Sequence, residues 1–141
     1  MSWRIEGRIE LVNCSHKFAV FARENGDTLA RHLEGPVFPG SLNIRTARRN
    51  IGDLLDLGFW PGEPDIVIPK AEFRGMPAWL GDGRAWRCIL RAAQATSARC
   101  LLFRRKGSRV RPGVIELLAP VGLVESLGLK HGQAVSVEGE T

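Results

Sequence analysis

The sequence has few cysteines and histidines and no long apolar run. Its three cysteines, Cys14, Cys88 and Cys100, are odd in number and widely spaced, so a disulfide framework is not expected. The three histidines stand apart and give no His/Cys metal pattern. No apolar run approaches the roughly 20 residues that a membrane helix needs, and the stretch MSWRIEGRIE lacks the apolar core of a signal peptide. These absences predict a cytoplasmic protein without a membrane segment.

Several nucleotide and nucleophile motifs are also missing. The chain contains neither a Walker A sequence nor GxGxxG, so ATP or dinucleotide binding by those routes is not supported. No GxSxG motif is present for a nucleophilic serine. Any chemistry must therefore use another arrangement of residues.

The composition is that of one globular domain. The chain has 141 residues, of which 44% are hydrophobic and 25% charged, and these values predict a single domain over residues 1–141 with its own core. The net charge is +5 and the isoelectric point about 9.7. This excess favours anionic partners such as nucleotides, phosphorylated metabolites or nucleic acid, although a basic surface without a ligand remains the alternative.

Period-two alternation predicts a mainly β fold. Residues 3–12 place Trp3, Ile5, Ile9 and Leu11 on one face and charged residues on the other. Further strands are predicted at 16–23 (HKFAVFAR, after an NCS turn), 41–45, 66–73, 84–93, 98–105, 114–120 and 130–140. Short helices are predicted at 27–33, capped by Asp27, within 46–65, and after Pro120 up to Gly128. Without βαβ alternation, this order favours a small β-barrel with inserted helices.

The segment FPGSLNIR, residues 38–45, combines turn residues with a polar strand face. Ser41, Asn43 and Arg45 alternate with Leu42 and Ile44, so a hydroxyl, an amide and a guanidinium share one face. The oxygens suit a hard cation such as Mg²⁺, and the guanidinium suits phosphate oxygens. An ordinary surface strand with polar outer residues is the alternative.

Two later features of the sequence each allow a functional and a purely structural interpretation. Glu116 stands alone in VIELLAP, where it could face a cavity and accept a proton, or simply face solvent. The loop FRRKGSRVRPG, residues 103–113, is either a phosphate or RNA contact or a solvated hairpin tip. Aromatic residues are not interleaved with its charges, which disfavours nucleic acid as a partner.

In their order and spacing, GPVFPGSLNI and GVIELLAPVGLVESLGLKHGQAVSVE resemble blocks of the archaeal-type CTP-dependent riboflavin kinases, which carry PGTLNV-like and EIIAP-type stretches. The resemblance spans nearly the whole chain. It implies a six-stranded cradle-loop β-barrel with a few short helices. It also implies transfer of a phosphoryl group from CTP to riboflavin, which gives FMN and CDP. The alternative is a non-catalytic barrel that binds a nucleotide, another anionic metabolite or a protein.

The same resemblance implies roles for individual residues. Ser41 and Asn43 match metal-binding positions for Mg²⁺, and Glu116 matches a glutamate at the flavin site, where it could act as the catalytic base. Ser108 stands in place of a flavin-site threonine. The nucleotide would be bound by two segments: Asn13, Cys14, Ser15, His16 and Lys17, and then Val121, Gly122, Leu123 and Val124.

The first of these nucleotide segments departs from the family pattern. Family members have a glycine-rich turn between the first two strands, whereas this chain has VNCSHK, residues 12–17, without a glycine. Side chains in this loop limit how closely the backbone can approach a phosphate. The resemblance therefore supports the metal-binding half of the site more strongly than the nucleotide-binding half.

Overall fold

The fold was analysed in a computed structural model, which describes residues 2–12, 17–75, 79–93, 96–108 and 111–140, without the side chain of Lys17. Seven strands are described: β1 (Arg4–Glu10), β2 (Leu42–Thr46), β3 (Ile66–Ile68), β4 (Gly83–Arg91), β5 (Ser97–Arg105), β6 (Val114–Leu118) and β7 (Ala134–Gly139). The helices are α1 (Lys17–Glu24), α2 (Gly26–His32), α3 (Ile51–Leu57), α4 (Leu123–Leu127) and a 3-10 turn η1 (Lys70–Glu72).

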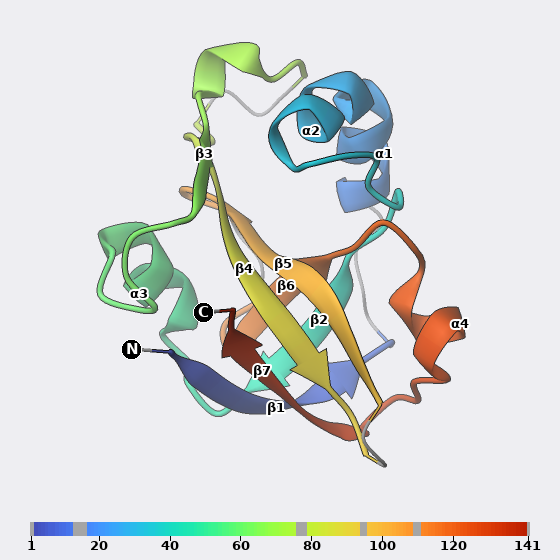
Figure 1. Cartoon of the computed structure of the whole chain (residues 1–141). Helices are drawn as coiled ribbons and strands as arrows, with labels where there is room; N and C mark the ends of the chain where they lie inside the picture. Colours follow the sequence, from blue (N-terminus) through green and yellow to red (C-terminus); the bar gives the residue numbers. More distant parts are fainter. Residues whose placement is uncertain (1, 13–16, 76–78, 94–95, 109–110, 141) are drawn as a thin grey trace.

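Six of the strands close into an antiparallel barrel (Figure 1). The order around it is β4-β5-β6-β2-β1-β7, and β7 pairs back onto β4 over Cys88–Arg91. Strand β3 adds to the free side of β4. The prediction of a mainly β fold with a six-stranded barrel and a few short helices is thus confirmed. Closure leaves no unpaired edge among the six barrel strands, which protects them from edge-to-edge association.

The barrel interior is filled by alternate residues of every strand. Ile5 and Ile9 of β1, Ile44 of β2 and Leu117 of β6 all belong to this core and are almost fully buried. The period-two pattern of the sequence therefore predicts the inward faces of β1, β2 and β6 correctly. Helix α3 closes one end, where Ile51 and Leu55 join the same core.

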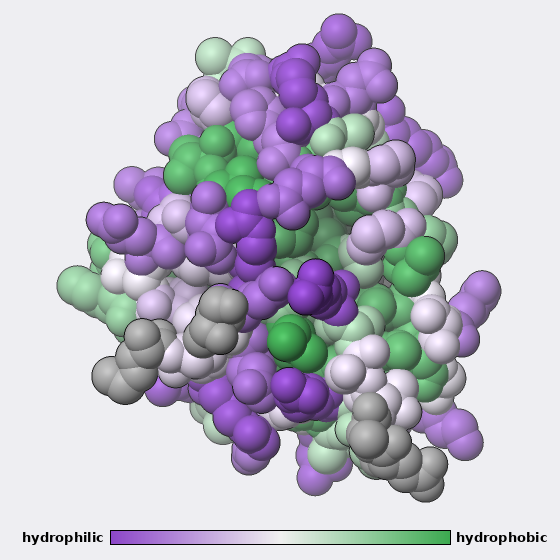
Figure 2. All heavy atoms as spheres, in the orientation of Figure 1, coloured by the Kyte–Doolittle hydropathy of each residue, from purple (hydrophilic) through white to green (hydrophobic). Residues whose placement is uncertain are grey.

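A second apolar cluster covers part of the outer face of the barrel. Phe103 of β5 and Leu118 of β6 point outward and pack under Ala22 of α1 and Leu29 of α2. Figure 1 shows α1 and α2 together above the barrel, and Figure 2 shows mostly hydrophilic side chains over this part of the surface. The two helices thus shield one outer region of the sheet while their own outer faces remain polar.

Helix α1 corrects the prediction of a strand over residues 16–23. The apolar side chains that reach the second cluster are Phe18, Phe21 and Ala22, a spacing of three and four residues that belongs to a helix. The prediction followed the apolar run FAVFA, and periodicity cannot assign so short a run to one type. The predicted NCS turn lies outside the described residues.

The other helices agree better with the sequence. Helix α2 forms where predicted, but its N-cap is Asn25 and Asp27 lies in the first turn. The predicted strand at 66–73 is shorter than expected, because only Ile66–Ile68 pair before η1 begins. Gly128 ends α4 in the left-handed conformation, as predicted from its position. None of the helices in the described ranges has the length and hydropathy that crossing a membrane would require.

Candidate functional site

The two sequence blocks that suggested a site lie side by side. Strands β2 and β6 pair antiparallel, and their register sets Asn43 directly opposite Glu116. Such a pair has Cβ atoms only about 5 Å apart on one face of the sheet. The preceding loop also contacts the second block, since the Phe38 amide donates to the Ala119 carbonyl at 2.9 Å. A Cβ at Gly122 would approach the Phe38 ring to 3.2 Å, so this glycine allows the loop to pack closely.

Ser41 brings its hydroxyl to both of these side chains. Its Oγ lies 3.4 Å from Asn43 Oδ1, and the hydroxyl lies near enough to Glu116 to lower the pKa of that carboxyl. A hydroxyl carries a single proton, so it donates to one of the two acceptors at a time. Oxygen atoms of Ser41, Asn43 and Glu116 therefore lie near one another on the outer face of β2 and β6. Such an all-oxygen set fits a hard divalent cation.

The environment of Glu116 favours its protonated form. Burial raises the pKa of this carboxyl above its ordinary value of 4.5, and it outweighs the hydrogen bond from Ser41 and the charge of Arg104, which both lower it. A carboxylate with a raised pKa accepts a proton more readily, which is the property that a general base needs.

A buried carboxylate on β1 lies in line with Asn43 and Glu116 across the three neighbouring strands. Glu10 pairs with Asn43 on the side away from Glu116, and its side chain is only 5% exposed. Arg45 and Arg111 bind its two oxygens at 2.7 and 2.8 Å. The hydrogen bond from Arg111 is the largest of the effects that lower the pKa of Glu10. Glu10 therefore stays ionised and holds two guanidinium groups beside the predicted metal position.

Sequence reasoning missed this role of Glu10. The alternation of β1 placed it on the solvent face with Arg4, Glu6 and Arg8, and it does lie on that face. It is nevertheless buried, because Arg45 from β2 and Arg111 from the β5–β6 connection cover it. No local signal in the sequence distinguishes it from the exposed Glu6.

Two arginines of the basic segment 103–113 are less exposed than the sequence suggested. Arg104 is only 10% exposed and forms a bidentate ion pair with Asp56 of α3. Arg105 is 7% exposed and stacks on Phe73, with its guanidinium carbon 4.4 Å from the ring centre. Both the RNA-contact interpretation and the solvated-tip interpretation are therefore wrong for these two residues.

Ser108 is held in place by the same contacts. Its carbonyl accepts a hydrogen bond from Arg104 at 2.9 Å, and its amide donates to the Arg105 carbonyl at 3.0 Å. Arg104 also acts electrostatically on Glu116. One arginine thus influences both residues that the family resemblance assigns to the flavin.

The predicted nucleotide segments are only partly described. Asn13, Cys14, Ser15 and His16, and the side chain of Lys17, lie outside the described residues. In the second segment, Leu123 is buried in the barrel core, so its side chain cannot contact a nucleotide. Val121 is 54% exposed, and Val124 packs partly against the core. Of this second segment, Val121 and the backbone around Gly122 are the accessible parts.

No metal cluster built from histidine, cysteine, aspartate and glutamate occurs within the described ranges. The oxygen set proposed above differs from such a cluster, because two of its three ligands, Ser41 and Asn43, are neutral and only Glu116 is a carboxylate. Two described cavities lie elsewhere, along β1, β2 and β7, and neither is lined by Ser41, Asn43 or Glu116. The expectation that Glu116 faces a cavity is thus not met by either of these two.

Comparison with known proteins supports a likeness to riboflavin kinases. The chain is 30% identical over 100 residues to a riboflavin kinase from Methanocella arvoryzae. The chain is thus similar to a riboflavin kinase over part of its length. The matched region covers 71% of this chain but only 40% of that kinase. No family profile matches the sequence.

Proposed function

We propose that this riboflavin-kinase-like barrel is a phosphotransferase that uses CTP and Mg²⁺ to convert riboflavin to FMN. The observation that carries the proposal is that Ser41 hydrogen-bonds Asn43, which lies directly opposite Glu116 on the neighbouring strand. This arrangement joins the residues that the resemblance assigns to the metal with the one it assigns to the acceptor. The similarity to a riboflavin kinase supports the same reaction class.

The proposed mechanism relies mainly on positioning and charge. Ser41 and Asn43 would hold Mg²⁺, which supplies neutralisation of the phosphate oxygens when bound. Glu116 would orient the ribityl hydroxyl and accept its proton as that oxygen bonds to the γ-phosphorus and CDP leaves. The free sides of the Arg45 and Arg111 guanidinium groups, which Glu10 holds, would stabilise negative charge on the transferred group.

Incubation with riboflavin, Mg²⁺ and each of the four ribonucleoside triphosphates tests this proposal. We expect FMN and CDP to form with CTP. Glu116→Gln should lower the rate by about 10²–10⁴-fold, and Asn43→Ala should raise the Mg²⁺ concentration needed for half-maximal rate by at least about tenfold. Asn50→Ala and Glu125→Gln are matched controls, since Asn50 makes no side-chain cap hydrogen bond and Glu125 is exposed. Absence of FMN with every donor would refute the proposal.

A non-catalytic nucleotide-binding barrel is the second candidate. It is favoured by the missing glycines in residues 12–17, where the family has a turn around the nucleotide. Calorimetric titration with CTP and CDP distinguishes the two candidates. Binding without turnover supports the second, whereas turnover excludes it.

A further inference from the structure

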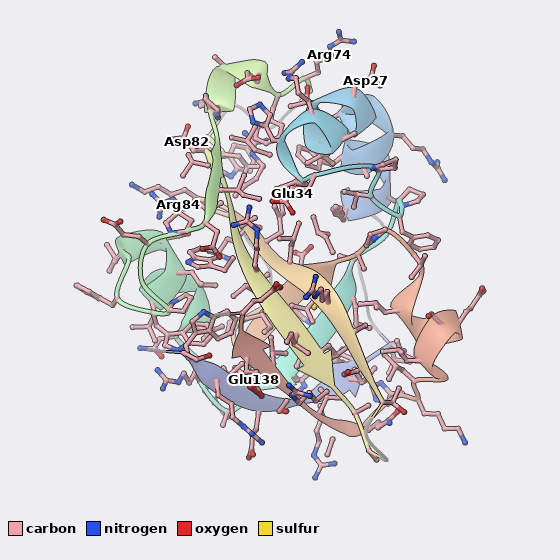
Figure 3. The ribbon with its side chains drawn as sticks, viewed as in Figure 1. Asp27, Glu34, Arg74, Asp82, Arg84 and Glu138 are labelled. Atoms are coloured by element: carbon pink, nitrogen blue, oxygen red, sulfur yellow. The ribbon has the colours of Figure 1, made fainter. Side chains whose placement is uncertain are left out.

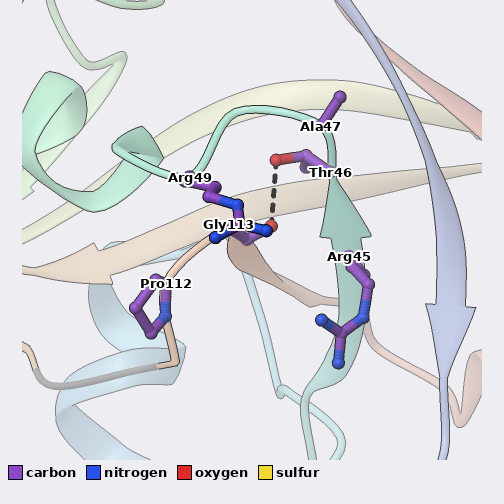
Figure 4. A pocket seen from close by; sticks show the side chains of 6 residues that line it. All are labelled: Arg45, Thr46, Ala47, Arg49, Pro112 and Gly113. Carbon is purple, nitrogen blue, oxygen red and sulfur yellow. Dashed lines mark hydrogen bonds between the residues drawn. The ribbon is translucent and has the colours of Figure 1, made fainter.

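An arginine-lined groove on the outer face of β1 and β7 shares only Arg45 with the proposed phosphotransferase site. It encloses about 780 Å³, and Arg4, Arg8, Arg45 and Arg91 contribute to its walls. A second cavity of about 510 Å³ adds Arg49 and is drawn in Figure 4. The two share Arg45, Thr46 and Ala47, so they lie next to each other, and together they are called here the arginine groove.

The positive charge of the arginine groove is only partly compensated. Arg4 pairs with Glu6 at 3.3 Å, Arg91 with Glu138 at 3.0 Å and Arg45 with Glu10 at 2.7 Å. The other two arginines differ: Arg8 donates to the Gly132 carbonyl at 2.9 Å, and neither Arg8 nor Arg49 forms an ion pair with any described carboxylate. Arg4, Arg45 and Arg91 are about half exposed, so their guanidinium groups can also reach an external anion.

Aromatic side chains lie close to Arg48, the chain neighbour of Arg49. The guanidinium carbon of Arg48 lies 5.7 Å from the ring centre of Trp60. Trp60 packs edge-on against Trp3 at 5.1 Å, and both rings are partly buried against the barrel core. Phe59, next to Trp60 in the sequence, is 75% exposed. Of these three aromatic residues, Phe59 is therefore the one whose ring an external base can reach most readily.

We propose that the arginine groove binds the sugar–phosphate backbone of single-stranded nucleic acid. Its two adjacent cavities provide room for several successive phosphates, whereas one phosphate would need only a single cluster of donors. The exposed Phe59 ring, close in the sequence to Arg49, offers a surface on which an unpaired base can stack, and a basic groove with a stacking ring is characteristic of sequence-independent single-strand binding. The placement of the groove leaves the oxygen set of Ser41, Asn43 and Glu116 untouched.

Fluorescence anisotropy with a labelled oligouridylate of about 12 nucleotides tests the proposal between about 50 and 200 mM salt. The variant is Arg8→Ala/Arg49→Ala. The control, Arg23→Ala/Arg74→Ala, removes the same charge from α1 and from the segment after η1. Figure 3 shows Arg74 at the opposite end of the molecule from Glu138 of β7. We expect the groove variant to bind about tenfold more weakly and to lower the slope of log K against log salt by about 1.4, because each lost phosphate contact removes about 0.7.

Competition with smaller phosphate compounds and binding of a duplex show which kind of phosphate-containing ligand the groove prefers. UMP and inorganic phosphate should compete only at concentrations far above that of the oligonucleotide, and a duplex of the same length should bind more weakly. Equal losses in the groove and control variants, no binding at low salt, equally tight UMP binding or tighter duplex binding would each overturn the proposal. The titrations contain no riboflavin or Mg²⁺, and the groove variant should form FMN at the wild-type rate. Failure of one proposal is thus distinguishable from failure of the other.

Discussion

The ion pair between Asp56 and Arg104 leads to a quantitative prediction about stability and site order. The Asp56 carboxylate accepts hydrogen bonds from Arg104 Nε at 2.7 Å, from an Arg104 terminal nitrogen at 3.1 Å and from the Gly107 amide at 3.1 Å. The two side chains are 18% and 10% exposed. Asp56 therefore links α3 to the turn that leads to Ser108, and Asp56→Ala should remove the hydrogen bonds that hold α3 and this turn together.

The expected magnitude follows from what remains after the substitution. Removal of one partner of a buried ion pair costs about 3–5 kcal/mol, because the other charge is left without compensation. Arg104 keeps its hydrogen bond to the Ser108 carbonyl and has some solvent access, so we expect about 2–3 kcal/mol. At about 3–4 °C per kcal/mol for a domain of this size, Tm should fall by about 6–12 °C.

The loss should depend on pH in a defined direction. Burial alone would raise the pKa of Asp56, but hydrogen bonds and charge from Arg104 outweigh it, so the pKa lies below its ordinary value of 3.8. A lowered native pKa gives stability that is present above pH 3.8 and is lost as the pH falls through the native value. Wild type and Asp56→Ala should therefore differ most at neutral pH and converge in acid.

Urea denaturation of six proteins tests this reasoning: the wild type, Asp56→Ala, Asp53→Ala, Asp56→Leu, Arg104→Leu and the double Leu variant. Asp53→Ala is the matched control, because Asp53 is an exposed aspartate of the same helix, and it should cost about 0.5 kcal/mol. The double variant Asp56→Leu/Arg104→Leu should lose less than the sum of its single variants, since no unpaired charge remains. A loss below about 1 kcal/mol for Asp56→Ala at neutral pH would refute the argument.

Three further predictions concern other parts of the barrel. Burial raises the pKa of Glu116, so the free-energy cost of a charged Glu116 in the folded protein develops as the pH rises from 4.5 through the native pKa. Glu116→Gln should therefore stabilise the protein more at pH 8 than at pH 4 in urea titrations. An equal effect at both pH values would contradict this. Gly7→Ala should cost about 1–3 kcal/mol by thermal denaturation, because its Cβ would lie 2.6 Å from the Arg45 carbonyl oxygen; an unchanged Tm would count against this packing. In a Cys14→Ser background, Cys88 and Cys100 should react with a thiol reagent only after unfolding, since both are buried and the pKa of Cys88 is raised; rapid native labelling would disprove it.

Sequence patterns were sufficient where one strand face is apolar and the other polar. The inward residues of β1, β2 and β6 follow from alternation, because every second residue of a strand faces the same side. The resemblance of two distant blocks also led to the expectation that Ser41, Asn43 and Glu116 act together, and the β2–β6 register places Asn43 directly opposite Glu116. The strand predicted over residues 16–23 was wrong, because a short apolar run fits either a strand or a helix until its packing partners are known.

The sequence by itself determined the barrel strands, most of their inward faces and the composition of the oxygen-rich row. Only the tertiary structure decided which charges are buried. Glu10 and Glu6 look alike along β1, yet Glu10 is enclosed by two arginines from other elements, and Arg104 finds Asp56 across 48 residues. Burial and ion pairing depend on neighbours distant in the chain, whereas strand periodicity depends on adjacent residues. The arginine groove also depends on neighbours that are distant in the chain, because no single segment contains it.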